Sequence, residues 1–258
     1  MILYSNNLIK IKKIKILKDN YVWVIVNNQK LVIIVDPGES KFLILYLRKR
    51  NYIPVSVFLT HKHEDHIEGV FFLLKNFPKL KIYGPREIKM FKTIIYVDEK
   101  KRIDLLGIKW KILHTPGHTK EHVSYYSYPF LFCGDVLFSG GCGRVYKNFY
   151  EEQFTSIQKI LSLPNEIFIY PSHEYTKKNL EFSSSLLKED KNIINYLNKI
   201  KNFKKKIFCS LPTKLKLEKK INIFLRTKEK MLKTSIGLSK NSNDIDCFIK
   251  LRILRNSY

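Results

Sequence analysis

The sequence predicts an α+β protein in which two packed sheets carry helices on their outer faces and a smaller helical region follows. Short runs rich in Ile, Val, Phe and Tyr alternate with amphipathic segments as far as residue 174, which suits this layered arrangement. After Tyr175 the apolar residues recur at helical spacing, with lysines between them. The chain has 258 residues and a hydrophobic content of 45%, which is enough for a sizeable core.

Each expected strand is a short apolar or alternating run, and each expected helix has apolar residues three or four positions apart. Strands are expected at residues 9–17, 21–27, 31–36, 55–60, 81–84, 108–114, 122–127, 130–134 and 167–171. Helices are expected at residues 40–50, 66–76, 86–92 and 151–162, and then at 176–187 and 192–203. The run Lys204-Lys205-Lys206 is interpreted as a solvated linker face.

The densest chemical signal is an H-x-H-x-D-H cluster formed by His61, His63, Asp65 and His66. It lies where an expected strand ends and an expected helix begins. Three imidazoles and a carboxylate this close together cannot all face one side of a regular element, so they suit a loop that wraps a metal. Nitrogen and oxygen ligands of this kind favour zinc or a similar first-row ion. A polar loop of hydrogen-bonding histidines is the alternative for any single histidine, whereas the whole set indicates a dinuclear metal site.

Two metals need more ligands than one cluster supplies, and three further residues have the right chemistry and placement. His118 lies in a Pro-Gly turn after the strand expected at 108–114, Asp135 ends the strand expected at 130–134, and His173 follows the strand expected at 167–171. Each residue comes just past an apolar strand, so a sheet is able to direct all of them to one rim.

These residues resemble the metallo-β-lactamase superfamily and, within it, the glyoxalase II family of hydroxyacylglutathione hydrolases. The superfamily resemblance rests on the cluster and on His118, Asp135 and His173 in that order. The resemblance to glyoxalase II rests on four further blocks: Asp19-Asn20-Tyr21, Asp36-Pro37-Gly38, Gly141-Cys142-Gly143-Arg144 and His173-Glu174-Tyr175-Thr176.

The resemblance implies a four-layer αββα sandwich as catalytic domain over residues 1–174 and a helical, substrate-binding domain over residues 175–258. It also implies how two divalent ions, most simply zinc but also iron or manganese, divide the ligands. His61, His63 and His118 are expected to bind one ion, Asp65, His66 and His173 the other, and Asp135 both. The glutathione contacts implied by the family's motifs are Arg144, Tyr146, Tyr175, Cys142, Arg252 and Arg255.

The activity that the resemblance implies is hydrolysis of S-D-lactoylglutathione and other 2-hydroxyacylglutathione thioesters to glutathione and D-lactate, the second step of methylglyoxal detoxification. A metal pair lowers the pKa of bound water towards about 7 and polarises a carbonyl, so a bridging hydroxide is expected to attack the thioester. Asp65 or Asp135 is expected to carry the residual proton. Asp36 is interpreted either as a partner of a metal-bound histidine or as a turn former before Pro-Gly.

Two other functions compete with this interpretation. A ribonuclease of the same fold shares the H-x-H-x-D-H cluster, and the net charge of +24 suits RNA. A binding protein with an unused metal site is the third. The blocks around Cys142 and Tyr175 and the helical tail favour the thioesterase. Glu68, Glu121 and Val145 depart from the family's pattern without removing an expected ligand.

The composition of the chain gives expectations for its partners, its cysteines and its location. The lysines are spread along the chain, so a compositional bias explains the charge of +24 as well as a binding function does, and no nucleic acid partner is expected. No run of 18 apolar residues and no signal peptide is recognisable, so no membrane association is expected. The 4 cysteines show no C-x-x-C spacing and are expected to be free thiols. A cytoplasmic monomer is predicted, with an organelle as the alternative location.

Overall fold

The computed structural model describes residues 2–4, 7–202 and 209–258 and divides into two compact units. The first unit comprises Met1–His114 and Glu121–Gly134, and the second comprises Thr115–Lys120 and Asp135–Tyr258. The lysine run at residues 204–206 lies outside the described residues. No helix among the described residues is both long enough and apolar enough to cross a bilayer.

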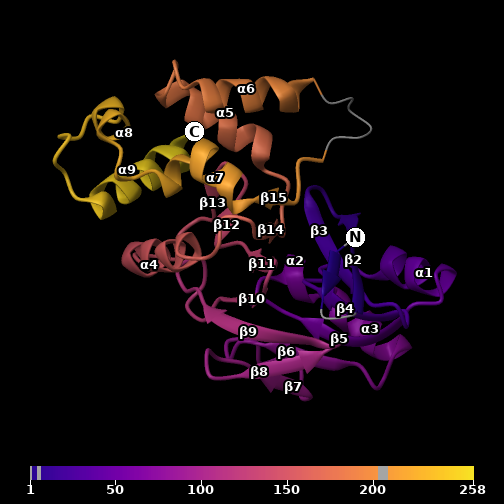
Figure 1. The fold of residues 1–258 in the computed structure, drawn as a ribbon. Coiled ribbons are helices and arrows are strands. Elements are labelled where there is room, and N and C mark those ends of the chain that lie inside the picture. The colour runs from indigo at the N-terminus through magenta and orange to yellow at the C-terminus, as the bar shows by residue number, and fades with distance from the viewer. Residues whose placement is uncertain (1, 5–6, 203–208) are drawn as a thin grey trace. The chain divides into compact units, whose positions relative to one another are not determined.

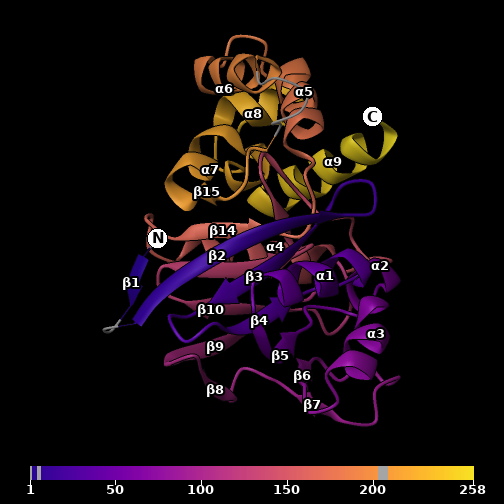
Figure 2. The same ribbon diagram turned by 90° about the vertical axis from the view of Figure 1, so that its right-hand side faces the viewer.

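The first unit is built on a seven-stranded sheet whose strands follow the order of the chain. Its first four strands pair antiparallel, and β4 to β7 pair parallel. The strands are β1 (Ile2–Tyr4), β2 (Asn7–Ile16), β3 (Asn20–Val26), β4 (Leu31–Val35), β5 (Ile53–Phe58), β6 (Lys81–Gly84) and β7 (Ile94–Tyr96). The uninterrupted apolar run of β4 suits a strand that is covered on both faces. Figure 2 shows β2 as the long strand that crosses this unit.

Three helices cover one face of this sheet: α1 (Lys41–Lys49), α2 (Glu64–Ile67) and α3 (Gly69–Asn76). Figure 1 shows α1 and α3 along the side of the sheet that faces away from β8 and β9. The core between helices and sheet is aliphatic, with Leu43, Leu47, Ile67, Val70 and Leu73 packed against Val24, Ile34, Val57 and Ile82. This burial holds α2 against the sheet, and α2 carries Asp65 and His66 of the cluster.

The opposite face of the sheet packs on a second sheet through aromatic rings. In the first unit this second sheet contains β8 (Arg102–Leu105), β9 (Ile108–His114), β10 (Val123–Ser127) and β11 (Phe130–Gly134). Phe58 of β5 stacks on Tyr125 of β10 at a centroid distance of 4.3 Å and meets Trp110 of β9 edge-on at 5.5 Å. The Tyr125 hydroxyl donates to the Leu59 carbonyl over 2.9 Å. The two sheets of the prediction therefore pack face to face.

The second unit contains the two remaining strands of the six-stranded sheet, a two-stranded hairpin and most of the helices. Its elements are β12 (Leu137–Phe138), β13 (Gly141–Cys142), α4 (Tyr150–Leu161), β14 (Phe168–Pro171), α5 (Thr176–Leu186), α6 (Lys191–Lys201), β15 (Thr213–Lys214), α7 (Leu215–Ile221), the 3₁₀ turn η2 (Ile223–Leu225), α8 (Lys230–Ser235) and α9 (Asp244–Ser257). Their apolar faces share one core that includes Ile157, Leu180, Ile193, Phe224 and Phe248.

Buried polar side chains from this helical region hold the β12–β13 hairpin. Glu218 of α7 accepts hydrogen bonds from the Ser139 hydroxyl at 2.7 Å and the Gly140 N–H at 2.9 Å. The Asn222 amide donates to the Phe138 and Gly141 carbonyls at 3.1 and 2.9 Å. Buried backbone groups need such partners, so the turn of the hairpin is fixed by residues that are distant in sequence.

The structure contains most of the expected strands and helices, but one predicted helix is absent. The strands expected at 81–84, 108–114 and 130–134 have these bounds in the structure. The helix expected at 86–92 is instead a run of turns, in which the Ile88 N–H donates to the Pro85 carbonyl. The connection between the parallel strands β6 and β7 consists only of residues 85–93, whereas a parallel crossover that contains a helix usually takes about a dozen residues or more. Ile88 and Phe91 are nevertheless buried, and this burial produced the apparent helical spacing.

We expect Phe58→Ala to lower the free energy of unfolding by about 3–5 kcal/mol, because the ring is fully buried between the two sheets. Phe42→Ala is the matched control, since Phe42 is 59% exposed and its replacement should change stability by less than about 0.5 kcal/mol. Denaturant unfolding followed by circular dichroism measures both. Equal effects at the two positions would contradict this account of the core.

Candidate metal centre

The H-x-H-x-D-H cluster begins in the connection from β5 to α2 and ends within α2, in the first unit. His63 has extended backbone angles and directly precedes α2, so the chain passes from extended to helical conformation within the cluster. Nε2 of His61 and Nδ1 of His63 lie 2.9 Å apart. His61 and His66 are buried, whereas His63 and Asp65 are half-buried. This change of conformation lets closely spaced residues direct their side chains to one region.

Asp36 links two parts of this connection. Its Oδ1 accepts from the Thr60 N–H at 2.9 Å, and its Oδ2 accepts from the Thr60 hydroxyl at 2.8 Å and lies 3.1 Å from Nδ1 of His66. An N–H at Nδ1 that donates to the carboxylate leaves Nε2 of His66 available as a metal ligand. The Gly38 N–H also donates to the Asp36 carbonyl at 3.0 Å. The backbone of Asp36 therefore forms the turn, and its side chain contacts a histidine that is an expected metal ligand.

Asn20 is a contributor to the site that residue chemistry alone did not indicate. Its side-chain amide donates to Oδ2 of Asp65 at 2.8 Å and to the Asp65 carbonyl at 3.3 Å. Asn20 is buried at the start of β3, far from the cluster in sequence. The available signal was the Asp19-Asn20-Tyr21 block, which carries no metal-ligating pattern of its own. The contact orients the carboxylate of an expected ligand.

Two glycines allow backbone segments to approach the expected ligands. A Cβ on Gly38 would lie 1.8 Å from the Asp65 carbonyl oxygen, so the Asp36 turn can touch the cluster only with glycine there. A Cβ on Gly143 would lie 1.9 Å from the Asp135 carbonyl oxygen. Glycine permits such close packing because it has no side chain.

The second unit brings His118, Asp135 and His173 together. Oδ2 of Asp135 lies 3.6 Å from Nε2 of His118 and 3.4 Å from Nε2 of His173. Nδ1 of His118 is 2.9 Å from the Arg144 carbonyl oxygen, which accepts its N–H. The Tyr175 ring stacks on the His173 ring at a centroid distance of 4.8 Å. In both histidines Nε2 is thus the nitrogen directed to the Asp135 carboxylate.

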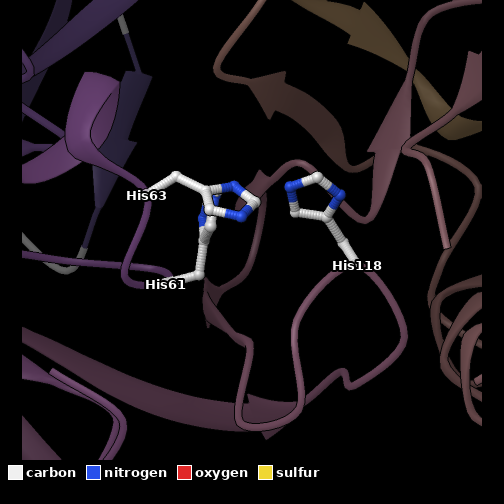
Figure 3. Close-up of side chains that lie close together, drawn as sticks. All are labelled: His61, His63 and His118. Atoms are coloured by element: carbon white, nitrogen blue, oxygen red, sulfur yellow. Dashed lines mark hydrogen bonds between the residues drawn. The ribbon is translucent and has the colours of Figure 1, made fainter. Parts of the chain in front are cut away.

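Potential ligand atoms gather in three groups, within each of which they lie no more than 4.8 Å apart. The groups are His61, His63 and His118; Asp65, His66 and His173; and His61, His66 and Asp135. Figure 3 shows the imidazoles of the first group close together. All seven expected ligands occur in these groups, although their individual roles stay predictions. A set of imidazole nitrogens and carboxylate oxygens fits a divalent metal such as zinc.

Three residues expected to contact substrate are accessible. Arg144 is exposed, whereas Tyr146 and Tyr175 are half-buried. The Tyr146 N–H donates to the Gly117 carbonyl at 2.6 Å, which ties its loop to the turn that carries His118.

The other three expected contacts are more enclosed. Arg255 donates to Oδ1 of Asn179 at 3.3 Å, whereas Arg252 is buried among backbone carbonyls. Burial raises the pKa of the buried Cys142 thiol, and the nearby Arg252 only partly opposes this. Cys142 is therefore a protonated thiol at neutral pH, which disfavours a nucleophilic role.

His114 and His122 are the histidines without an expected ligand role. His122 is buried and stacks on His61 at a centroid distance of 5.1 Å, so it packs against an expected ligand. The His114 N–H at the end of β9 donates to Oε1 of Glu99 at 3.0 Å. These contacts fit structural roles for both residues.

We expect Asp36→Asn to weaken metal binding about 10–100-fold, because an amide replaces the carboxylate that orients His66. Metal retained after dialysis against a graded chelator series measures the effect. Asp104→Asn is the control, since Asp104 is exposed on β8. Unchanged metal retention in a folded Asp36→Asn protein would refute the role of Asp36.

Solved structures similar to this chain share its fold. A metallo-beta-lactamase from Staphylococcus aureus matches with a TM-score of 0.66 and 22% identity over 95% of this chain and 66% of that chain. The BLEG-1 B3 metallo-beta-lactamase matches with a TM-score of 0.58 and 28% identity over 64% of this chain and 92% of that chain. The profile of the metallo-beta-lactamase superfamily matches residues 17–173. The expected αββα metallo-β-lactamase sandwich with a helical C-terminal region is thereby confirmed.

Sequence relatives are more specific. The profile described as hydroxyacylglutathione hydrolase C-terminus matches residues 174–258. A hydroxyacylglutathione hydrolase of Buchnera aphidicola subsp. Baizongia pistaciae is 45% identical over 94% of this chain and 97% of its own length. That of Yersinia pseudotuberculosis is 40% identical over 93% of this chain and 96% of its own length. The chain therefore belongs to the hydroxyacylglutathione hydrolase family of the metallo-β-lactamase superfamily.

Proposed function

We propose that this enzyme hydrolyses S-D-lactoylglutathione and related 2-hydroxyacylglutathione thioesters to glutathione and D-lactate, the second step of methylglyoxal detoxification. The observation that carries the proposal is the three-group cluster of seven ligands in a chain that is 45% identical to a hydroxyacylglutathione hydrolase. A thioester is a suitable substrate, because its carbonyl is electrophilic and its thiolate leaves without strong general-acid help.

The mixture of imidazoles and carboxylates supports two divalent ions, proposed to be zinc, with iron or manganese as alternatives that the same ligands suit. His61, His63 and His118 would bind one ion, Asp65, His66 and His173 the other, and Asp135 both. When bound, such a pair supplies an ionised water at neutral pH and polarises the substrate carbonyl.

Two carboxylates of the chain, those of Asp65 and Asp135, are placed to transfer the proton of the reaction. Asn20 holds Oδ2 of Asp65 at 2.8 Å, so this carboxylate keeps one orientation while a proton is transferred. Asp135 faces Nε2 of both His118 and His173, within 3.6 Å. Asp65 and Asp135 are therefore the proposed catalytic groups, each able to accept a proton at a carboxylate oxygen and pass it to the departing product.

Arginines in the second unit suit the carboxylates of glutathione. Burial lowers the pKa of Arg255, and the charges of Arg252 and Arg144 lower it further, so positive charges are concentrated there. An anion bound beside Arg144 and Arg255 would offset this repulsion. Tyr146 and Tyr175 add half-exposed aromatic surfaces, and Cys142 would contribute to the enclosed wall of the site.

The remaining proposals concern organisation and location. We propose that residues 1–174 form the catalytic domain and residues 175–258 the substrate-binding domain, a division supported by the boundaries of the two matching profiles. A monomer in the cytoplasm is proposed. The location is supported by the four cysteines, all within the described residues, which are free thiols as suits a reducing compartment.

We expect purified protein to hydrolyse S-D-lactoylglutathione, with the thioester absorbance falling and chelator abolishing the reaction. Added zinc should restore it, because the ligands fit that ion. Metal content is measured in the same sample. Bound metal without turnover would overturn the glutathione thioester proposal, and cleavage of RNA that weakens steeply with salt would then support a ribonuclease.

We expect Arg144→Ala to raise KM about tenfold with little change in kcat, because an exposed arginine that anchors a substrate carboxylate contributes roughly 1.4 kcal/mol to binding substrate and transition state alike. Steady-state kinetics with S-D-lactoylglutathione measures this. Lys188→Ala is the control for general charge, since Lys188 is exposed between α5 and α6. A pure loss of kcat at Arg144 would refute the anchoring role.

A further inference from the structure

Two of the four buried side chains of α4 are polar, whereas the inner face of an amphipathic helix is normally apolar. These are Gln153 and Ser156, which are 0% and 2% exposed and lie three positions apart, so they share one face of the helix. The other two, Ile157 and Ile160, are fully buried aliphatic residues. Burying a polar group costs free energy unless the group has a partner, so the contacts of this polar pair are informative.

Gln153 joins the segment after Asp135 to the turn before His118. Its Nε2 donates to the Val136 carbonyl at 2.9 Å, and Val136 directly follows Asp135. Its Oε1 lies against Gly117, where a Cβ would come within 2.2 Å of this oxygen. Gly117 has a φ of 133° and directly precedes His118. One side chain therefore contacts a chain neighbour of each of these two expected metal ligands.

Ser156 holds the same turn at a second point. Its hydroxyl donates to the Pro116 carbonyl at 2.7 Å, two residues before His118. The Gly117 carbonyl accepts from the Tyr146 N–H at 2.6 Å. Backbone carbonyls of a turn that lies outside a sheet ladder need donors of this kind, and the donors set where the turn lies.

The free-energy cost of Gln153 argues that the residue does more than fill space. Its Oε1 has no hydrogen-bond partner within the part of the chain that the structure describes, and such an oxygen in the interior is destabilising. An aliphatic side chain of similar size would fill the same volume without this cost. It would not supply the donor that the Val136 carbonyl receives from Gln153.

The apolar core of the second unit holds α4 itself. Phe154 of α4 meets the Phe248 ring of α9 at a centroid distance of 5.7 Å, and Ile157 belongs to the same core. Nε2 of His118 and Oδ2 of Asp135 lie 3.6 Å apart. A helix that is anchored in the core and contacts the segments of both ligands is able to set this separation.

We propose that Gln153 and Ser156 are positioning residues of the metal centre, which fix the turn of His118 relative to the segment of Asp135. The inference rests on the proposed metal centre and not on the identity of the thioester. Neither residue belongs to the set expected from sequence to bind metal or substrate. Each acts through the backbone, since each donates to a carbonyl within two residues of an expected ligand.

The test compares Gln153→Met and Ser156→Ala with wild type in the full-length, zinc-loaded protein. Zinc affinity is measured by competition with a chromogenic chelator, and the visible absorption of the cobalt-substituted protein reports the geometry of the ligands. We expect Gln153→Met to lose about tenfold in zinc affinity and to alter the cobalt spectrum. Ser156→Ala removes one hydrogen bond and should lose about threefold in zinc affinity.

Two control variants lie on the same helix. Ile157→Val trims a buried side chain of the helical core, so it should lower the melting temperature and keep wild-type zinc affinity and cobalt spectrum. Thr155→Ala removes an exposed hydroxyl and should leave all three quantities unchanged.

Circular dichroism checks the fold of each variant, and Ser156→Ala carries the test if Gln153→Met does not fold. Wild-type zinc affinity and an unaltered cobalt spectrum in the folded variants would overturn the proposal. An equal loss of zinc affinity in Ile157→Val would overturn it as well, because the loss would then reflect general destabilisation. If wild-type protein binds zinc but does not hydrolyse S-D-lactoylglutathione, the proposed function fails while zinc affinity still decides the roles of Gln153 and Ser156.

Discussion

The metal centre depends on hydrogen bonds made by the histidine nitrogens that face away from the expected metals. An imidazole binds a metal through one nitrogen only, so its orientation is set by the partner of the other. Here Nδ1 of His61 lies 3.0 Å from the Thr60 hydroxyl, Nδ1 of His66 3.1 Å from Asp36, and Nδ1 of His118 2.9 Å from the Arg144 carbonyl. These partners lie on segments that the fold holds independently.

The turn of Asp36 shows how far that support extends. Asp36 has a φ of 49°, a left-handed conformation that is uncommon for a residue with a side chain. The conformation lets its side chain face Thr60 and His66 while Gly38 touches the Asp65 backbone. Aliphatic packing holds α1 and α3 on the first sheet of the same unit, and the start of α3 touches this turn, since a Cβ on Gly69 would lie 2.3 Å from the Pro37 carbonyl oxygen. Packing in the aliphatic core of the first unit thereby helps to hold the expected ligands Asp65 and His66 in position.

The helical C-terminal residues provide comparable support in the second unit. Glu218 and Asn222 form hydrogen bonds with backbone groups of the β12–β13 hairpin. Arg252 donates to the Cys142 carbonyl at the end of this hairpin. Phe138 of the hairpin meets the His173 ring edge-on at 5.8 Å. A region that the sequence associates with substrate thus also contributes contacts to the segment between Asp135 and Arg144, which explains why buried polar groups are concentrated there.

The sequence by itself indicated the candidate ligand residues and the strands that carry them. Their signals are local: the H-x-H-x-D-H spacing and the apolar runs before His118, Asp135 and His173 need no knowledge of distant neighbours. The supporting contacts of Asn20 and Arg252 were decided only by the tertiary structure, because each joins residues 45 to 110 positions apart. The turns at 86–92 were decided in the same way, by the parallel pairing of β6 with β7. Local pattern specifies which side chains carry chemistry, whereas long-range packing specifies what holds them in position.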